Sequence, residues 1–452
     1  MFFIPVYILI LFSTIVIDYF AGILIERSAG KVRRMYLVLS LIANIGVLAV
    51  FKYYNFAAAS ITEVANWLQL GVSPPLLGII LPIGLSFHTF QAMSYTIEVY
   101  WDRTKAERHF GIYALYVMFY PQLVAGPIER PQNLLHQFRR EHHVDYDRIV
   151  HGLKLMTWGL FKKVVIADRI AEVVDLVYAN PYGHSDLALM IATILYAYQI
   201  YCDFSGYSDI AIGAAQVMGF SLMTNFRRPY YARSIQEFWS RWHISLSTWF
   251  RDYLYIPLRG NRVSPWRWRF NLFVVFLVSG LWHGANWTFV IWGGLHGIYM
   301  VIATVCGRSW RRTLQGMGFS ETSSAVSLAE HLMTLAAVAY AWIFFRAASV
   351  SDAFHVLRRT TLGMPDIVHQ ALSISGLRAC VNELLWTKAE WLTLFLSIAI
   401  LELYQYHDER GGALAKYGSL PTPLRWAGYY AFIAVIILLG SFGAQQFIYF
   451  QF

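Results

Sequence analysis

The chain has 452 residues, of which 57% are hydrophobic and only 14% are charged. A soluble protein carries about 25% charged residues, so this composition excludes an ordinary soluble protein. The net charge of +9 would suggest nucleic acid in a soluble chain. In a membrane protein it follows from basic cytoplasmic loops, and we expect membrane lipid and no nucleic acid as partners.

Long apolar blocks recur along the chain. They lie near 2–25, 35–56, 76–100, 110–128, 149–178, 187–220, 270–306, 328–345, 391–406 and 427–450. A run of about 18 apolar residues is long enough to cross a hydrocarbon core of roughly 30 Å. The sequence lacks the repeats of a solenoid and the alternating segments of a membrane barrel. We therefore predict an all-α, polytopic integral membrane protein with about 9–11 transmembrane helices plus re-entrant segments.

Basic residues predict the sidedness of the first connections. The block 2–25 lacks a basic start and a cleavage site, so we expect a retained first helix. Segment Glu26–Arg34 and segment Arg103–Arg108 carry the basic residues and are placed in the cytoplasm. Residues 53–102 contain no Lys or Arg, so their hydrophilic part, around Ala57–Pro75, is placed outside.

Two blocks have arginine at both ends and are predicted to enter the membrane and return. Block 110–128 is broken by proline and glycine, and broken backbone at membrane depth needs protein or water around it. In block 270–306, Gly280, Gly284, Gly293 and Gly294 allow tight turns or close helix packing. Between the two blocks, residues 224–269 carry nine Arg among aromatic residues, which predicts a cytoplasmic segment at the interface.

The strongest candidate for chemistry is His283, in Trp282-His283-Gly284-Ala285-Asn286-Trp287. Ionisable residues inside apolar blocks are functional candidates, and histidine can take a proton from a hydroxyl acceptor. Trp282 or Asn286 could stabilise an oxyanion there. The alternative is a structural histidine that bonds between helices. His296 follows 13 positions later, in Gly-Gly-Leu-His-Gly.

A second candidate cluster is Arg241-Trp242-His243 in the basic aromatic stretch. Arg241 and Arg251 could hold the phosphates of a nucleotide-bearing donor, and His243 could assist His283 or cap the pocket. The alternative is an interfacial helix that attracts anionic lipid.

The third cluster is Asp203-Phe204-Ser205-Gly206-Tyr207-Ser208-Asp209, where carboxylates and serines interrupt an apolar block. Asp203, Ser205 and Asp209 could brace the site or bind a polar substrate. The alternative is a structural polar knot that stabilises a helix break.

Several other chemistries lack their sequence motifs. The three cysteines, Cys202, Cys306 and Cys380, are far apart and are read as free thiols without metal spacing. No G-x-S-x-G elbow, Walker loop or H-E-x-x-H helix occurs. We expect no bound metal, no permanently bound cofactor and no covalent serine mechanism.

With these motifs the chain resembles the membrane-bound O-acyltransferase family. The matching stretches are PQLVAGPI at 121–128, DFSGYSD at 203–209, EFWSRWHISLSTWFRDYLYIPLRGNR at 237–262 and SGLWHGANWTFVIWGGLHG at 279–297. They cover most of residues 80–300 in the family's order. Within the family the chain looks most like the bacterial alginate O-acetylase branch, which includes enzymes that acetylate cellulose and peptidoglycan. That branch usually has further apolar segments before the stretch that resembles Phe2–Gly22.

The resemblance implies a single membrane domain over 1–452, with a catalytic core of about 80–300 and a ring of helices around a central tunnel. It implies that His283 is the catalytic histidine and that His243 is the second polar position. Acetyl-CoA would be the cytoplasmic donor substrate. A separate periplasmic acetyltransferase would receive the acetyl group and esterify the polysaccharide, and the chain would lie in the bacterial inner membrane.

Two readings from other classes stay open. Broken helices with midplane polar residues also suit a transporter, although no inverted repeat is evident. A non-catalytic subunit of a polysaccharide secretion complex is the other. Among enzymes, alginate, cellulose and peptidoglycan all fit as the acetylated polymer.

Overall fold

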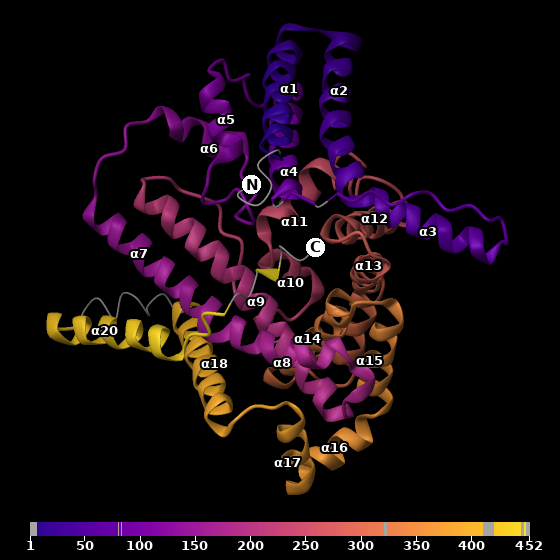
Figure 1. Cartoon of the computed structure of the whole chain (residues 1–452), viewed down its shortest axis with the longest axis vertical. Coiled ribbons are helices and arrows are strands. Elements are labelled where there is room, and N and C mark those ends of the chain that lie inside the picture. Colours follow the sequence, from indigo (N-terminus) through magenta and orange to yellow (C-terminus); the bar gives the residue numbers. More distant parts are fainter. Residues whose placement is uncertain are drawn as a thin grey trace.

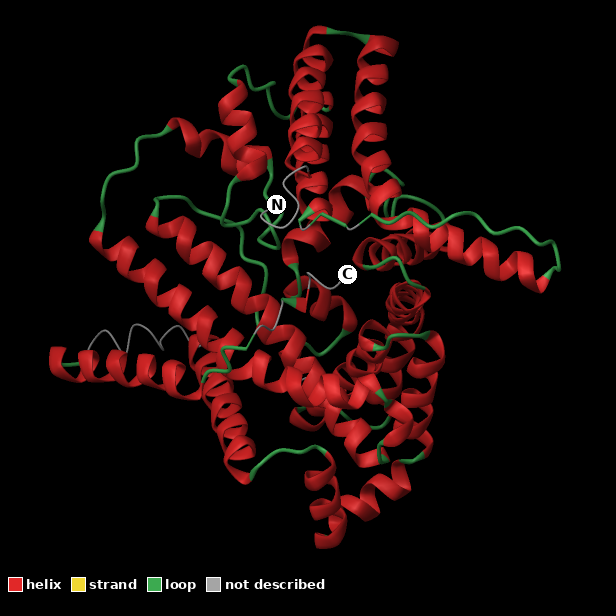
Figure 2. Cartoon of the chain, viewed as in Figure 1, coloured by secondary structure: helices red, strands yellow, loops and turns green. Residues whose placement is uncertain are grey.

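The computed structural model describes residues 7–79, 81–82, 84–320, 323–409, 420–443 and 447–448, and all regular structure in these ranges is helical (Figure 1; Figure 2). This confirms the predicted all-α class. The start of block 2–25 lies outside the described residues. The same holds for the side chains of Arg308 and Arg311, two of the arginines that follow block 270–306.

The N-terminal part forms an upright group of helices (Figure 1). Its elements are α1 (Tyr7–Arg27), α2 (Gly30–Leu48), the π-helical turn η1 (Ala49–Tyr53), α3 (Tyr54–Trp67), α4 (Leu85–Tyr100), α5 (Phe110–Met118), α6 (Pro131–Leu134) and the 3₁₀ turn η2 (Leu135–Arg139). Helices α1, α2 and α4 pack on one another, while α3 projects to the side.

The two predicted cytoplasmic connections lie against each other. Only two residues separate α1 from α2, so most of the basic residues of the first connection belong to the first turn of α2. Arg33 donates to Asp102 at 2.6 Å, and this contact with the guanidinium holds the pKa of that exposed carboxyl below its usual value. Arg108 pairs with Glu26. Contacts between the two segments agree with their placement on one side of the membrane.

The middle of the chain supplies the longest helix pair. Its elements are α7 (Tyr146–Leu160), the π-helical turn η3 (Phe161–Ala167), α8 (Asp168–Ala179), the 3₁₀ turn η4 (Pro181–Gly183) and α9 (Asp186–Val217). Helix α7 packs along α9. Because α9 runs unbroken through 203–209, the alternative of a helix break at this cluster is wrong.

The catalytic-core motifs fall on shorter elements followed by a helical hairpin. These are the 3₁₀ turn η5 (Pro229–Tyr231), α10 (Ile235–Arg241), α11 (Ile244–Phe250), the π-helical turn η6 (Arg251–Tyr255), α12 (Pro265–His283) and α13 (Trp287–Gly316). Helices α12 and α13 pack closely, as predicted for block 270–306. A Cβ on Gly280 would lie 2.3 Å from the Phe289 carbonyl, and one on Gly293 would lie 2.4 Å from the Phe276 carbonyl. Only glycine permits this approach.

The C-terminal part surrounds the lower half of the molecule in Figure 1. Its elements are α14 (Ser324–Arg346), α15 (Val350–Leu362), α16 (Met364–Leu372), α17 (Ile374–Glu383), α18 (Lys388–Glu409) and α20 (Thr422–Leu439). Helix α14 packs on α13 and on α9, which closes the core around the motif region.

Six stretches of the described helices are long and apolar enough to cross a membrane. They are Tyr7–Arg27, Gly30–Trp67, Asp186–Val217, Trp287–Gly307, Ser324–Arg346 and Thr422–Leu439. The pair Ile374–Glu383 and Lys388–His407, bent by 93°, would make a seventh. The other apolar blocks lie in helices that are shorter, broken or more polar, so the larger predicted number of crossings stays a prediction.

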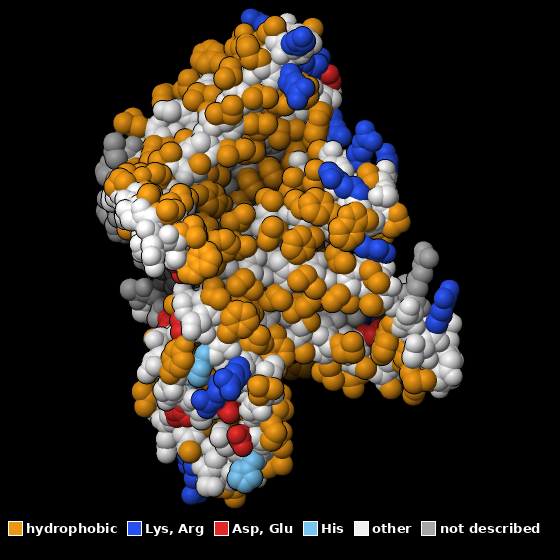
Figure 3. All heavy atoms as spheres, turned by 90° about the vertical axis from the view of Figure 1, so that its right-hand side faces the viewer, with side chains coloured by type: hydrophobic (Ala, Val, Ile, Leu, Met, Phe, Trp, Pro, Cys, Tyr) orange, Lys and Arg blue, Asp and Glu red, His pale blue; other side chains and the backbone are white. Residues whose placement is uncertain are grey.

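The surface agrees with a lipid environment. Figure 3 shows a face covered mainly by hydrophobic side chains, with Lys and Arg along the upper right edge and a further charged group in the lower lobe. Exposed apolar side chains include Ile8, Ile42, Ile302 and Leu438. A soluble protein seldom exposes such a large continuous apolar surface, so the chain is a multi-pass membrane protein.

Candidate functional site

The structure brings His243 and His283 together in the interior. Their ring centroids are 6.4 Å apart, and the two side chains come from different elements. His283 is the last residue of α12, and His243 precedes the first turn of α11. Both residues are buried, at 0% and 5% exposure. The two motifs that carried the sequence argument therefore form one site.

The backbone at His243 is held in an uncommon conformation. Its φ of 42° and ψ of 56° lie in the left-handed region, which residues other than glycine seldom adopt. Asn225 fixes the next two residues, because its carbonyl accepts from Ile244 N at 2.9 Å and its side chain accepts from Ser245 Oγ at 2.7 Å. Strain of this kind persists only where the surroundings enforce it, and it is common at functional sites.

The proline-broken segment 119–130 supports the same loop. The backbone N–H of Ile128 donates to Ser245 Oγ at 3.0 Å, so the PQLVAGPI stretch contacts the His243 loop directly. Gly126 lies so close to Gln122 that a Cβ would meet the Gln122 Cα at 2.3 Å. The broken backbone is thus covered by protein, as expected for irregular structure in a membrane protein.

Aromatic rings surround the two imidazoles. The Phe204 ring lies 4.6 Å from the His243 ring, and Phe87 stacks on His243 at 6.2 Å. Rings of three further residues lie 4.9–5.4 Å from the His283 ring, namely Trp282, Trp292 and Phe345. Such walls restrict water around the imidazoles and hold the ring planes in place.

His296 lies one aromatic layer behind His283. The Trp292 ring separates the two histidines, at 4.9 Å from His283 and 5.0 Å from His296. Trp239 Nε1 donates to His296 Nδ1 at 3.2 Å. With Nδ1 accepting, a proton on His296 belongs to Nε2 in the neutral ring. His296 is therefore part of the site's wall, behind the Trp292 ring.

The Asp203 cluster lies beside the site in a charge network of its own. Lys163 binds Asp203 at 2.6 Å and Asp168 at 2.7 Å, while Lys162 binds Asp209 at 2.5 Å and Ser205 at 2.9 Å. Phe204, which follows Asp203 on α9, packs on His243 and links the network to the histidines. This geometry favours the bracing reading over direct substrate binding.

Three lysines of the site region were missed by the sequence argument. Lys162 and Lys163 neutralise the carboxylates, and Lys52 donates to the carbonyls of Trp282 and His283 at 2.6 and 3.0 Å. Each stands inside or at the end of an apolar block. Their position in apolar blocks is a sequence signal, because ionisable residues inside a membrane are functional candidates. The sequence prediction considered only His and Asp in this way.

The other predicted binding residues are divided between the core and the surface. Trp242 is buried in an aromatic core against Phe238 and Trp342. Arg241 pairs with Glu237 at 2.5 Å. The Asn286 side chain caps α13 by accepting from Thr288 N at 3.0 Å, and it donates to the Ala348 carbonyl at 3.3 Å.

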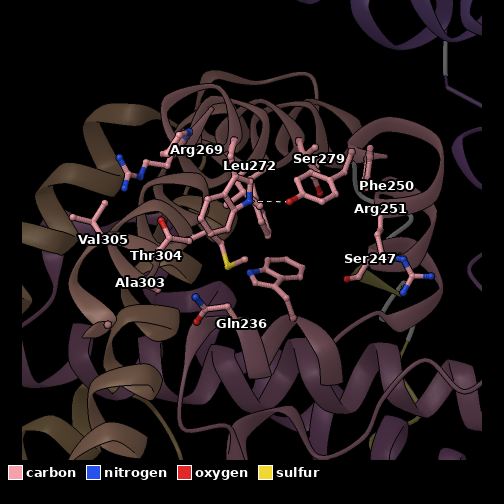
Figure 4. Close-up of a pocket in the computed structure, with 18 of the residues that line it drawn as sticks. Gln236, Ser247, Phe250, Arg251, Arg269, Leu272, Ser279, Ala303, Thr304 and Val305 are labelled. Carbon is pink, nitrogen blue, oxygen red and sulfur yellow. Dashed lines mark hydrogen bonds between the residues drawn. The ribbon is translucent and has the colours of Figure 1, made fainter. Parts of the chain in front are cut away.

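A cavity of about 790 Å³ opens beside the site (Figure 4). The basic aromatic segment, α12 and α13 line it, and Arg251 and Arg269 lie at opposite ends in the view. Trp268 Nε1 donates to the Tyr255 hydroxyl at 2.8 Å in its wall. Trp239, which contacts His296, and Ser279, one turn before His283, also line it. The cavity is therefore adjacent to the aromatic wall of the histidines.

A helical membrane protein with a buried histidine pair beside a cavity is the class that fold and site define. The membrane-bound O-acyltransferase family matches residues 102–339, a range that holds both histidines. The chain belongs to this family. It is a multi-pass membrane acyltransferase.

Relatives named as O-acetylases or O-acetyltransferases match most of the chain. A probable alginate O-acetylase of Pseudomonas aeruginosa is 37% identical over 84% of this chain and 75% of its own length. A probable alginate O-acetylase of Pseudomonas putida is 33% identical over 96% and 88%. The peptidoglycan O-acetyltransferase of Helicobacter pylori is 36% identical over 78% and 69%.

Proposed function

We propose that the chain is an O-acetyltransferase that carries acetyl groups from cytoplasmic acetyl-CoA across the bacterial inner membrane for O-acetylation of an extracytoplasmic polysaccharide. The acetyl group would pass to a periplasmic acetyltransferase that esterifies the polymer. The observation that carries the proposal is the buried pair His243 and His283, 6.4 Å apart and adjacent to the cavity wall. The relatives that acetylate cell-surface polymers support the choice of acyl group.

His283 acts as the general base in this mechanism. Its neutral imidazole takes the proton of the acceptor hydroxyl as the hydroxyl oxygen attacks the thioester carbonyl carbon. The C–S bond then breaks, and the CoA sulfur leaves with the proton that His283 returns. The products are an acetyl ester and free CoA. His243, at the start of α11, helps to orient the acceptor or His283. Its loss is expected to lower activity less than the loss of His283.

The cavity offers a place for the donor. CoA carries phosphates, and the guanidinium groups of Arg251 and Arg269 at opposite ends of the cavity suit charge-assisted bonds to them. The apolar and aromatic wall between the arginines suits the pantetheine arm and the adenine ring. Arg241 and Trp242, which bond and pack elsewhere, contribute to the shape of this region.

Alginate or a similar exopolysaccharide is the polymer we favour, because two alginate O-acetylases match the chain over three quarters or more of their own length. Peptidoglycan is the second candidate, favoured by the Helicobacter pylori relative. Both use the same ester chemistry, so the site alone does not separate them.

The test is base-labile acetate on purified cell-surface polymers from a deletion strain complemented with wild type, His283→Ala or His369→Ala. His369 is exposed on α16, far along the chain from the site, and is the matched histidine control. Wild type and His369→Ala should restore the acetate, and His283→Ala should not, with equal protein in the membrane by immunoblot.

The fraction that regains acetate identifies the polymer. Wild-type acetate in the His283→Ala strain would refute the base assignment. If deletion changes no acetate on any polymer, the transporter or another acyl acceptor becomes the better explanation. Release of CoA from acetyl-CoA by the purified protein separates an enzyme from both non-enzymatic readings.

A further inference from the structure

The end of α12 at the histidine site depends on donors from a distant element. A helix leaves its last carbonyls without partners in the helix, and these need donors from outside. The residue after His283 is Gly284, whose φ of −157° is extended, so the left-handed glycine cap that often ends a helix is not formed here. The carbonyls of Leu281, Trp282 and His283 instead accept from η1.

Two consecutive residues of η1 make these contacts. Lys52 Nζ lies 2.6 Å from the Trp282 carbonyl oxygen and 3.0 Å from that of His283, and Tyr53 Oη donates to the Leu281 carbonyl at 2.8 Å. A π-helical turn widens the helix locally and often occurs at functional sites. The turn Ala49–Tyr53 directs both side chains to the same helix end.

We propose that Lys52 is a positioning residue for acyl transfer, whose side-chain amino group clamps the final carbonyls of α12 and so fixes the rings of Trp282 and His283. The inference rests on the proposed role of His283 as the base. The Lys52 amino group lies at the negative end of the helix dipole, where a hydrogen-bond donor is favoured. The half-buried Lys52 also lies 6.0 Å from the centre of the Trp282 ring.

Precise placement of the base is what such a clamp contributes. A displacement of the base by about 1 Å can lower a rate on the order of 100-fold, even when the displaced residue itself is unchanged. Donor binding in the cavity involves other residues, because neither Lys52 nor Tyr53 lines it. The clamp should therefore act on kcat and leave the KM for acetyl-CoA near its wild-type value.

The experiment uses membrane vesicles from complemented deletion strains, supplied with radiolabelled acetyl-CoA, and measures initial rates of base-labile label at varied donor concentration. Lys52→Met should lower kcat about 10- to 100-fold with KM changed by less than about 3-fold, and Lys52→Arg should recover a large part of kcat. Lys154→Met is the control, because Lys154, on α7, lies over the ring of Tyr429 on α20.

A second pair of variants keeps the test valid if Lys52→Met fails to reach the membrane. Tyr53→Phe removes the bond to the Leu281 carbonyl, whereas Tyr54→Phe removes a bond to the Pro75 carbonyl. A lower kcat in the first variant alone supports the clamp, and equal kcat in both refutes it.

A wild-type kcat in Lys52→Met, or the same loss in Lys154→Met, also overturns the proposal. His283→Ala is measured in parallel. If it stays active, the proposed function fails, whereas an inactive His283→Ala beside a fully active Lys52→Met refutes the clamp alone.

Discussion

The histidine site and the lysine–carboxylate network are neighbours in the core, and α9 contributes to both. Phe204 packs on His243, while Asp203 and Ser205 on either side bind Lys163 and Lys162. Each carboxylate of the network contacts a lysine, and Lys163 is shared by Asp203 and Asp168. The histidines instead lie within aromatic rings at fixed backbone positions. The difference separates residues that stabilise the helix bundle from residues placed for chemistry.

Breaking the network should give the largest loss of stability. Lys163→Met leaves Asp203 and Asp168 buried without their cation, and removal of one partner from a buried ion pair costs about 3–5 kcal/mol. We expect a large drop in the thermal unfolding midpoint of the detergent-solubilised protein, measured by intrinsic fluorescence. His283→Ala should abolish activity with a much smaller drop.

The double variant Lys163→Met/Asp203→Asn should recover part of the lost stability, because it removes charges of both signs. Lys154→Met controls for the loss of a lysine. A Lys163→Met protein as stable as wild type but inactive would reverse the division between the two regions and place the network in the catalytic machinery.

An intermediate loss of stability is expected at the contact between α12 and α13. His283 is the last residue of α12, so this contact helps to place it. In Gly293→Ala the new methyl would lie 2.4 Å from the Phe276 carbonyl oxygen and 2.9 Å from the Gly280 Cα. Forcing the helices apart should cost about 1–3 kcal/mol of unfolding free energy and lower kcat as well. The kcat is measured in membranes, and the unfolding free energy is measured on protein purified from the same membranes.

The adjacent Gly294→Ala is the matched control, since its methyl would meet only Leu277 Cδ1, at 4.0 Å. Equal behaviour of the two variants would mean that close packing of this hairpin does not position the site.

The sequence was sufficient for the helical membrane class, whereas the two histidine motifs were linked mainly through the family resemblance. Long apolar blocks specify helices in lipid almost regardless of tertiary contacts. Glycines in block 270–306 likewise predicted the close hairpin, and Gly280 and Gly293 confirm it. These features depend on local composition, which a single sequence displays.

Features that depend on distant partners were not predictable in the same way. Lys52 and Trp282 are 230 positions apart, and no local pattern links them. The Asp203 cluster suggested a helix break because Asp, Ser and Gly are poor helix formers. Lys162 and Lys163 of the neighbouring turn η3 bind the polar groups of this cluster, so α9 continues without a break. Tertiary contacts decided both cases.

The smallest predicted effect is at the rim of the cavity. A residue there should contribute to donor binding but not to the stability of the helix bundle. Arg251 has a side chain 60% exposed and pairs with Asp252 at 2.8 Å. Exposed charge pairs contribute about 0–1 kcal/mol, so Arg251→Ala should raise the KM for acetyl-CoA only about 2- to 5-fold and leave the unfolding midpoint unchanged.

Arg267→Ala provides the matched control for this rim position. Arg267 is exposed on α12 and lies over the Phe270 ring, outside the cavity lining. If Arg251→Ala and Arg269→Ala each raise KM and Arg267→Ala does not, the cavity is the donor's entry. A weaker salt dependence of KM in the first two variants would follow from the lost phosphate contacts, because screening acts on exposed charges. An unchanged KM in both would place the donor elsewhere, and would leave the histidine site intact.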